Sequence, residues 1–80
     1  LKNNSLLASI YTSFGSIYVY MYQYKLSLKY YNDALKITIK TNGVVNNASL
    51  LNNIGSVYLY MNNTDEALKY YQKALNLYLK

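Results

Sequence analysis

Side chains able to perform acid–base or covalent chemistry are scarce in this 80-residue sequence, which has no histidine and no cysteine. It therefore lacks thiol nucleophiles, imidazole bases, disulfides and the usual zinc ligands. The acidic residues are Asp33, Asp65 and Glu66, and Asp33 lies about one repeat away from the other two. No glycine-rich phosphate loop is present. The sequence predicts no enzyme, no cofactor and no metal site.

Lysine supplies most of the charge, since eight lysines and no arginine give a net charge of +5. Lysine lacks the planar fork with which arginine reads guanine or clamps phosphate. Four of the lysines would lie within about 60° of one another on a helix. We favour a solvated outer face and expect neither nucleic acid nor membrane as a partner; a polyanion-binding surface remains the alternative. The two stripes are Lys25, Lys29, Lys36 and Lys40, and then Lys69, Lys73 and Lys80.

An internal repeat organises the elements that would position these groups. Shifting the sequence by 40 places Gly15 on Gly55, and 11 of the 22 residues in 15–36 are identical to those in 55–76. Such self-similarity is typical of helical repeat proteins. We expect a single domain over 1–80, with one repeat at about 8–41 and a second at about 48–80.

Each copy is expected to form two helices. Apolar residues at 50, 51, 54, 57, 58 and 61 have the spacing of an amphipathic helix from about 50 to 61. The sequence Asn62-Asn63-Thr64 then predicts a turn, and Asn63 and Glu66 have the spacing of a reciprocal N-cap. In the first copy we expect helices near 6–21 and 24–41. Gly43 is expected to end the second of these with a positive φ.

The pattern resembles the tetratricopeptide repeat, a helical hairpin of 34 residues. The resemblance implies an all-α, right-handed helical-hairpin solenoid with two units and four antiparallel helices. The period of 40 is similar to the longer-helix variety found in kinesin light chains, and Ser27 replaces the usual alanine. The signature positions are Tyr11, Phe14, Gly15, Tyr18, Ser27, Tyr31 and Ala34 in the first copy, and Leu51, Ile54, Gly55, Tyr58, Ala67, Tyr71 and Ala74 in the second.

Packing accounts for several of these residue types. Gly55 and Ala67 are expected where the two helices of a unit cross closely, so that a side chain larger than methyl would separate them. Tyr58 and Tyr71 are expected to fill the space between neighbouring elements.

By the same resemblance, the first helix of each unit lines a concave groove that holds an extended peptide or a partner helix. Asn53 is the strongest candidate, because an asparagine there contacts the peptide backbone in longer-period relatives; a solvated asparagine remains the alternative. The first helices carry no lysine, which argues against a carboxylate clamp. The candidate binding residues are Thr12, Ser13, Ser16, Tyr20, Asn52, Asn53, Ser56 and Tyr60, with Ser9, Val19, Ser49 and Leu59 beside them.

Two repeats form a small core, and neither end carries a polar cap. We expect the last helix to expose an apolar edge that contains Tyr71, Leu75, Tyr78 and Leu79. Either the chain is part of a longer array, which its start without methionine favours, or copies associate through this edge, in particular through Leu75 and Leu79. The absence of cysteine weakly favours a reducing, cytoplasmic location.

Overall fold

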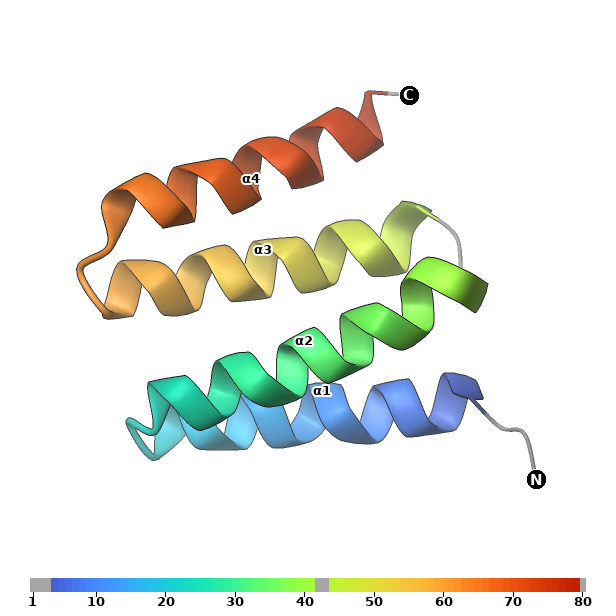
Figure 1. Cartoon of the computed structure of the whole chain (residues 1–80), viewed down its shortest axis with the longest axis horizontal. Helices are drawn as coiled ribbons and strands as arrows, with labels where there is room; N and C mark the ends of the chain where they lie inside the picture. Colours follow the sequence, from blue (N-terminus) through green and yellow to red (C-terminus); the bar gives the residue numbers. More distant parts are fainter. Residues whose placement is uncertain (1–3, 42–43, 80) are drawn as a thin grey trace.

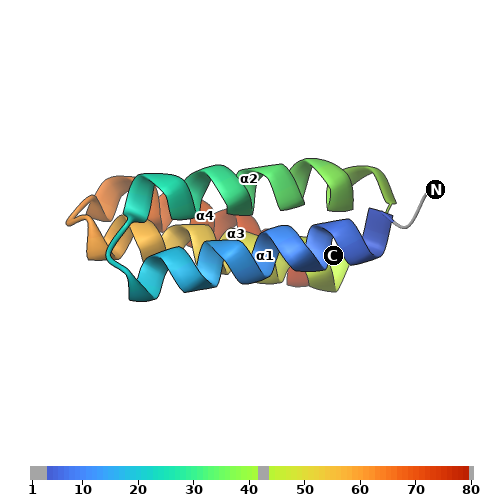
Figure 2. The same cartoon turned by 90° about the horizontal axis from the view of Figure 1, so that it is seen from below.

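The computed structural model describes residues 4–41 and 44–79, which form two α-helical hairpins (Figure 1). Both hairpin turns lie at one end of the molecule, and α1 begins and α4 ends at the other. Figure 2 shows α2 lying over α1, with the second hairpin behind them. The all-α prediction is confirmed, and the described ranges contain no strand. The helices are α1 (Asn4–Tyr20), α2 (Tyr24–Thr41), α3 (Val44–Tyr60) and α4 (Thr64–Tyr78).

The predicted helix bounds hold for the first hairpin, but α3 begins six residues before the expected Leu50, at Val44. Tertiary packing explains the difference. Ala48 is fully buried in a small cluster with Leu51 and Ala74, so the apolar face of α3 continues upstream of Leu50. The predicted positive φ of Gly43 lies outside the described residues.

The turns of the two hairpins use the same hydrogen bonds. In the second, the Asn62 N–H donates to the Leu59 carbonyl at 2.9 Å and the Asn63 N–H donates to the Tyr58 carbonyl at 2.8 Å. In the first, Tyr22 and Gln23 repeat this pattern at 3.0 and 2.8 Å. These bonds satisfy the last carbonyls of the helix and require one residue in the left-handed region. That residue is Tyr22 (φ 60°) in one turn and Asn62 (φ 62°) in the other.

The reciprocal cap expected at the start of α4 is only half formed. The Glu66 N–H donates to Asn63 Oδ1 at 3.3 Å, which is the predicted N-cap bond. The return bond is not formed, because the Asn63 N–H is already used by Tyr58 and the Glu66 carboxylate lies 3.2 Å from Lys69 Nζ. The Asn63 N–H is therefore used in the hairpin turn and not in the reciprocal cap.

Two single substitutions, each of which gives one turn the left-handed residue of the other, should change the free energy of unfolding in opposite directions. A tyrosine in the left-handed region costs about 1 kcal/mol that asparagine largely avoids. Tyr22→Asn should therefore raise the free energy of unfolding by about 1 kcal/mol. Asn62→Tyr should lower it by a similar amount. Urea unfolding followed by circular dichroism would measure both, and equal shifts of the same sign would contradict the turn assignment.

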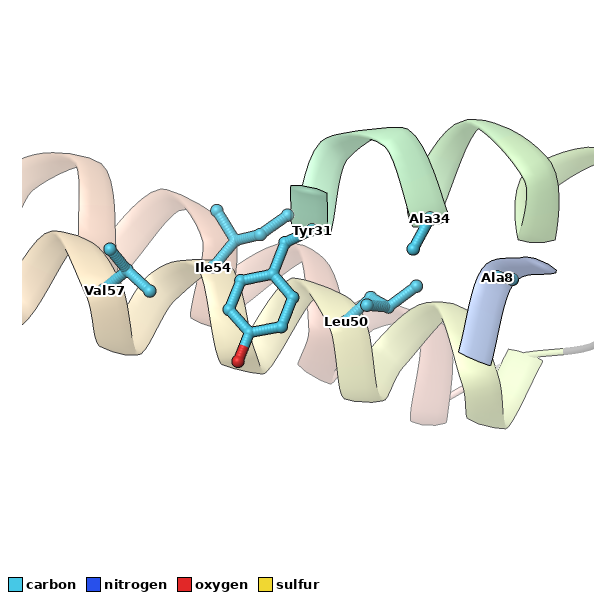
Figure 3. Packing of buried hydrophobic residues seen from close by; sticks show 6 residues of the cluster. All are labelled: Ala8, Tyr31, Ala34, Leu50, Ile54 and Val57. Carbon is cyan, nitrogen blue, oxygen red and sulfur yellow. The ribbon is translucent and has the colours of Figure 1, made fainter. Parts of the chain in front are cut away.

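The core lies where the two hairpins meet, between α2 and α3 (Figure 3). Tyr31 and Ala34 from α2 pack against Leu50, Ile54 and Val57 from α3, and α1 adds Ala8. Small alanines allow the helices to approach, and the branched side chains of α3 fill the space between them. The second hairpin is thus held to the first mainly through α2. No helix in the described ranges is long and apolar enough to cross a bilayer.

Candidate functional site

A polar groove runs between α1 and α3. It consists of two hollows of about 440 Å³ and 310 Å³, and Asn53 lines both of them. We call this feature the α1–α3 groove. The first hollow is lined by Ser5, Ala8, Ser9, Thr12, Ser13, Thr38, Ser49, Leu50 and Asn53. The second is lined by Ser16, Val19, Tyr20, Tyr31, Asn53, Ser56, Val57 and Tyr60.

Helical periodicity places these side chains in one row on each helix. The lining residues follow the i, i+3, i+4 and i+7 spacing of a helix face. They are 5, 8, 9, 12, 13, 16, 19 and 20 on α1, and 49, 50, 53, 56, 57 and 60 on α3. Residues with this spacing share one face of a helix. The remaining faces of α3 are occupied by the packing against α2 and α4.

In each hairpin, one tyrosine of the second helix contacts a serine that lines the groove. Ser16 Oγ and the Tyr31 hydroxyl lie 2.9 Å apart, and Ser56 Oγ and the Tyr71 hydroxyl lie 2.8 Å apart. Thr12 Oγ1 donates to the Ala8 carbonyl at 2.8 Å. These hydroxyls are therefore held in fixed positions, and each oxygen keeps a further lone pair for another partner.

Most of the predicted groove residues are brought together by the fold. Thr12, Ser13, Ser16, Tyr20, Asn53, Ser56 and Tyr60 line the hollows, together with Ser9, Val19 and Ser49. Asn52 and Leu59 line neither hollow.

Sequence reasoning missed the contributions of Thr38 and Tyr31 from α2. One signal could have revealed Tyr31, because Ser16/Tyr31 and Ser56/Tyr71 recur with the same separation of 15 residues.

The signature tyrosines have partners that the sequence did not indicate. Tyr18 stacks on Tyr30 with ring centroids 5.6 Å apart, and Tyr58 stacks on Tyr70 at the same distance. Partial burial raises the pKa of the Tyr58 phenol, and the neighbouring Tyr70 adds to the shift. The Tyr71 ring lies against Gly55, between the two helices of its own hairpin.

Among the residues that the structure describes, none that lines the α1–α3 groove is charged. On α2, Lys29 Nζ lies 3.1 Å from Asp33 Oδ2, and this hydrogen bond raises the pKa of the lysine. Lys69 pairs with Glu66 on α4. Lys80 lies outside the described residues, and within the described ranges no cluster of side chains could hold a metal ion. An uncharged groove with hydroxyls and amides can hydrogen-bond an uncharged main chain but offers no counter-ion.

The comparison with protein families identifies the repeat. A family model described as Tetratricopeptide repeat matches residues 6–80. The chain belongs to the tetratricopeptide repeat family. Tetratricopeptide repeats generally mediate protein–protein interactions and typically serve as non-enzymatic scaffolds. The match confirms the predicted family, while the longer-period variety and the right-handed superhelix remain predictions. Neither the curated proteins nor the solved structures yielded a match to this chain.

One tetratricopeptide signature position departs from the family pattern, and the structure explains why it is tolerated. Ser27 is completely buried, and its hydroxyl donates to the Gly15 carbonyl at 2.8 Å. The hydroxyl is therefore satisfied at the point where α1 and α2 cross. Its counterpart Ala67 is buried in the same way without a polar group. The small size of the residue is what both units retain.

Proposed function

We propose that the α1–α3 groove binds an extended, uncharged segment of a partner protein. The observation that carries the proposal is Asn53, whose side chain lines both hollows. An asparagine amide can donate to a peptide carbonyl and accept from a peptide N–H, so it recognises main chain without selecting side chains.

The two hollows would select different parts of the segment. The first is lined mainly by small hydroxyl side chains, whereas the second carries Tyr20 and Tyr60. Tyrosines give a large contact area with few rotatable bonds, so we expect an apolar or aromatic ligand side chain at this end. The described lining residues are all uncharged, which favours ligand segments without acidic or basic side chains, because a charge buried against them would lack a partner.

A peptide-display selection against the 80-residue chain would test this function. Peptides with an uncharged central segment should be enriched. Fluorescence anisotropy of one enriched peptide should show about tenfold weaker binding to Asn53→Ala, the effect of losing one or two hydrogen bonds. Gln72→Ala, on the exposed surface of α4 and outside both hollows, is the matched control and should bind like the unaltered chain.

A labelled oligonucleotide, titrated in parallel at two salt concentrations, addresses the lysine stripes. We expect no salt-dependent binding. If no peptide is enriched and the oligonucleotide binds more weakly at high salt, the groove proposal fails. Polyanion binding by the lysine stripes would then be the function that the results support.

A second candidate function, self-association, is favoured by a comparison of equivalent residues in the two repeats. Ile54 and Val57 are 0 % and 1 % exposed because α2 covers them. Their counterparts Phe14 and Ile17 are 42 % and 49 % exposed, although they are equally apolar. At the other end of the chain, α4 exposes the residues that correspond to the covering face of α2. We call these surfaces the α1 face (Ile10, Phe14 and Ile17) and the α4 face (Tyr71, Leu75 and Tyr78).

We infer that the α4 face of one copy can cover the α1 face of the next, as α2 covers α3 within the chain. Such a contact joins two different surfaces, so it forms open chains of molecules and not closed pairs. Light scattering after size-exclusion chromatography should then show a mass that rises with concentration.

Two variants test the head-to-tail arrangement. Phe14→Lys and Leu75→Lys should each remain monomeric, because each lacks one of the two faces. An equimolar mixture of the two variants keeps one intact pair of faces and should form dimers and nothing larger. Larger assemblies in the mixture, or dimers of either variant alone, would contradict the arrangement, and a concentration-independent monomer mass for the unaltered chain would reject self-association.

A further inference from the structure

A separate groove lies between α2 and α4, with α3 as its floor. Its volume is about 460 Å³, and it shares no lining residue with the α1–α3 groove. We call it the α2–α4 groove. Its surface is mainly apolar, with one lysine and two asparagines. The lining residues are Leu35 and Ile39 from α2, Asn47 and Leu51 from α3, and Tyr70, Lys73, Asn76 and Leu77 from α4.

Asn47 is the first residue in this groove that packing alone does not explain. Its Oδ1 is buried and has no hydrogen-bond partner within the described ranges. The same repeat position in the first copy is Leu7, which is 39 % exposed. The chain thus has leucine at the more exposed of the two positions, and asparagine at the half-buried one, where its oxygen is out of contact with solvent. This is the reverse of what stability favours, since an unpaired amide oxygen is costly to bury.

Lys73 is the second such residue. Its ammonium lies over the Tyr70 ring, 4.7 Å from the centroid, and no ion pair to an acidic group is formed in the described part of the chain. The nearby Lys69 is paired with Glu66. In the first copy the equivalent position is Asp33, which pairs with Lys29. A lysine here is therefore not a requirement of the repeat, and its charge is available to a ligand.

We propose that the α2–α4 groove binds a peptide segment in which a large apolar side chain stands next to an acidic one. The apolar side chain lies on Leu35, Leu51 and Leu77, and the carboxylate contacts the Lys73 ammonium. The Asn47 amide rotates toward the groove, and its Oδ1, which is buried in the unliganded chain, accepts a hydrogen bond from a peptide N–H. The unpaired oxygen decides between two amphiphilic ligands. A peptide has N–H donors, whereas an ionised fatty acid has only acceptors. The site is independent of the α1–α3 groove.

Titration of the ¹⁵N-labelled chain with acetyl-Leu-Glu-Leu-amide, followed by ¹H–¹⁵N spectra, would test the site. The amide signals of Asn47, Leu51, Lys73 and Leu77 should shift, and those of Asn53 and Ser56 should not. Acetyl-Leu-Gln-Leu-amide should bind about fivefold more weakly, since it lacks the charge that one partly exposed ion pair uses. Monomeric decanoate should also bind more weakly than the glutamate peptide.

Two variants separate recognition from folding. Lys73→Gln should bring the affinities for the two peptides close to equality, whereas Lys36→Gln on α2, outside the groove, should leave the fivefold preference unchanged. Asn47→Leu should unfold at a higher temperature and yet bind the glutamate peptide more weakly, a combination that a merely structural asparagine would not give. Equal binding of the two peptides to the unaltered chain, stronger binding of decanoate, or shifts confined to the α1–α3 groove would overturn the proposal.

Discussion

Replacing Ile54 with alanine is expected to lower the free energy of unfolding by about 3 kcal/mol. Ile54 is 0 % exposed and lies in the cluster that joins α2 to α3. Removing its side chain leaves a cavity in the main contact between the hairpins, which rigid helices cannot close fully. A chain of this size has a free energy of unfolding of only about 4–12 kcal/mol, so the loss is a large fraction of the total. Urea unfolding followed by far-ultraviolet circular dichroism would measure it.

Phe14→Ala is the matched control, because Phe14 occupies the same position in the first repeat. Its side chain is 42 % exposed and contacts the Tyr30 ring at a centroid distance of 5.2 Å. We expect a cost of about 1 kcal/mol or less for a side chain that stays largely in solvent. Equal costs at the two positions would show that the α2–α3 contact contributes little and that each hairpin folds on its own.

Gly15→Ala is the second change with a large expected effect. A Cβ at this position would lie 2.6 Å from Cδ1 and Cε1 of Tyr31. Tyr31 cannot move away easily, because it is buried between the hairpins and its hydroxyl is bonded to Ser16. Overpacking of this kind costs about 1–3 kcal/mol, of which the better helix propensity of alanine recovers about 1. We expect a net loss of stability and a lower melting temperature by differential scanning calorimetry.

Gly55→Ala is the corresponding change in the second repeat and should be far milder. The added Cβ would lie 3.0 Å from Cε1 of Tyr71 and 3.3 Å from the Ala67 carbonyl oxygen. The Tyr71 hydroxyl is also bonded to a serine, Ser56, but the residue is only half-buried because no other helix of the described ranges covers it. Its ring can therefore shift by a few tenths of an ångström. The gain in helix propensity should then roughly cancel the crowding. If Gly55→Ala proves as damaging as Gly15→Ala, the burial of the facing tyrosine is not what decides the cost.

The two glycine positions show how far repeat reasoning extends. The sequence predicted that Gly55 and Ala67 mark a close crossing of helices, and the short distance from a Cβ at Gly55 to the Ala67 oxygen agrees. It also implied that a methyl group would be tolerated there. At Gly15 even a methyl group meets the Tyr31 ring. Tyr31 is buried against the second hairpin, whereas Tyr71 is only half-buried. A pattern within one repeat does not contain that information.

Helix phase was predictable because it follows from spacing within a single element. For this reason most of the residues predicted for the α1–α3 groove lie on the same faces of α1 and α3. Which partner each of two adjacent tyrosines contacts was not predictable. Tyr30 stacks on Tyr18 while Tyr31 reaches Ser16, and the choice depends on how α1 and α2 cross. The early start of α3 has a similar origin, since Ala48 is buried through its packing with Ala74.

The start of α1 and the end of α4 lie at the same end of the molecule, and this placement has a mechanical consequence. Because α1 begins and α4 ends at the end of the molecule opposite the turns, tension between these points enters each hairpin at its open end (Figure 1). Such a load peels one helix from its neighbour turn by turn, so the contacts break in succession and not all at once, as they would under shear. The fold should therefore extend at low force. The α2–α3 contact is expected to break last.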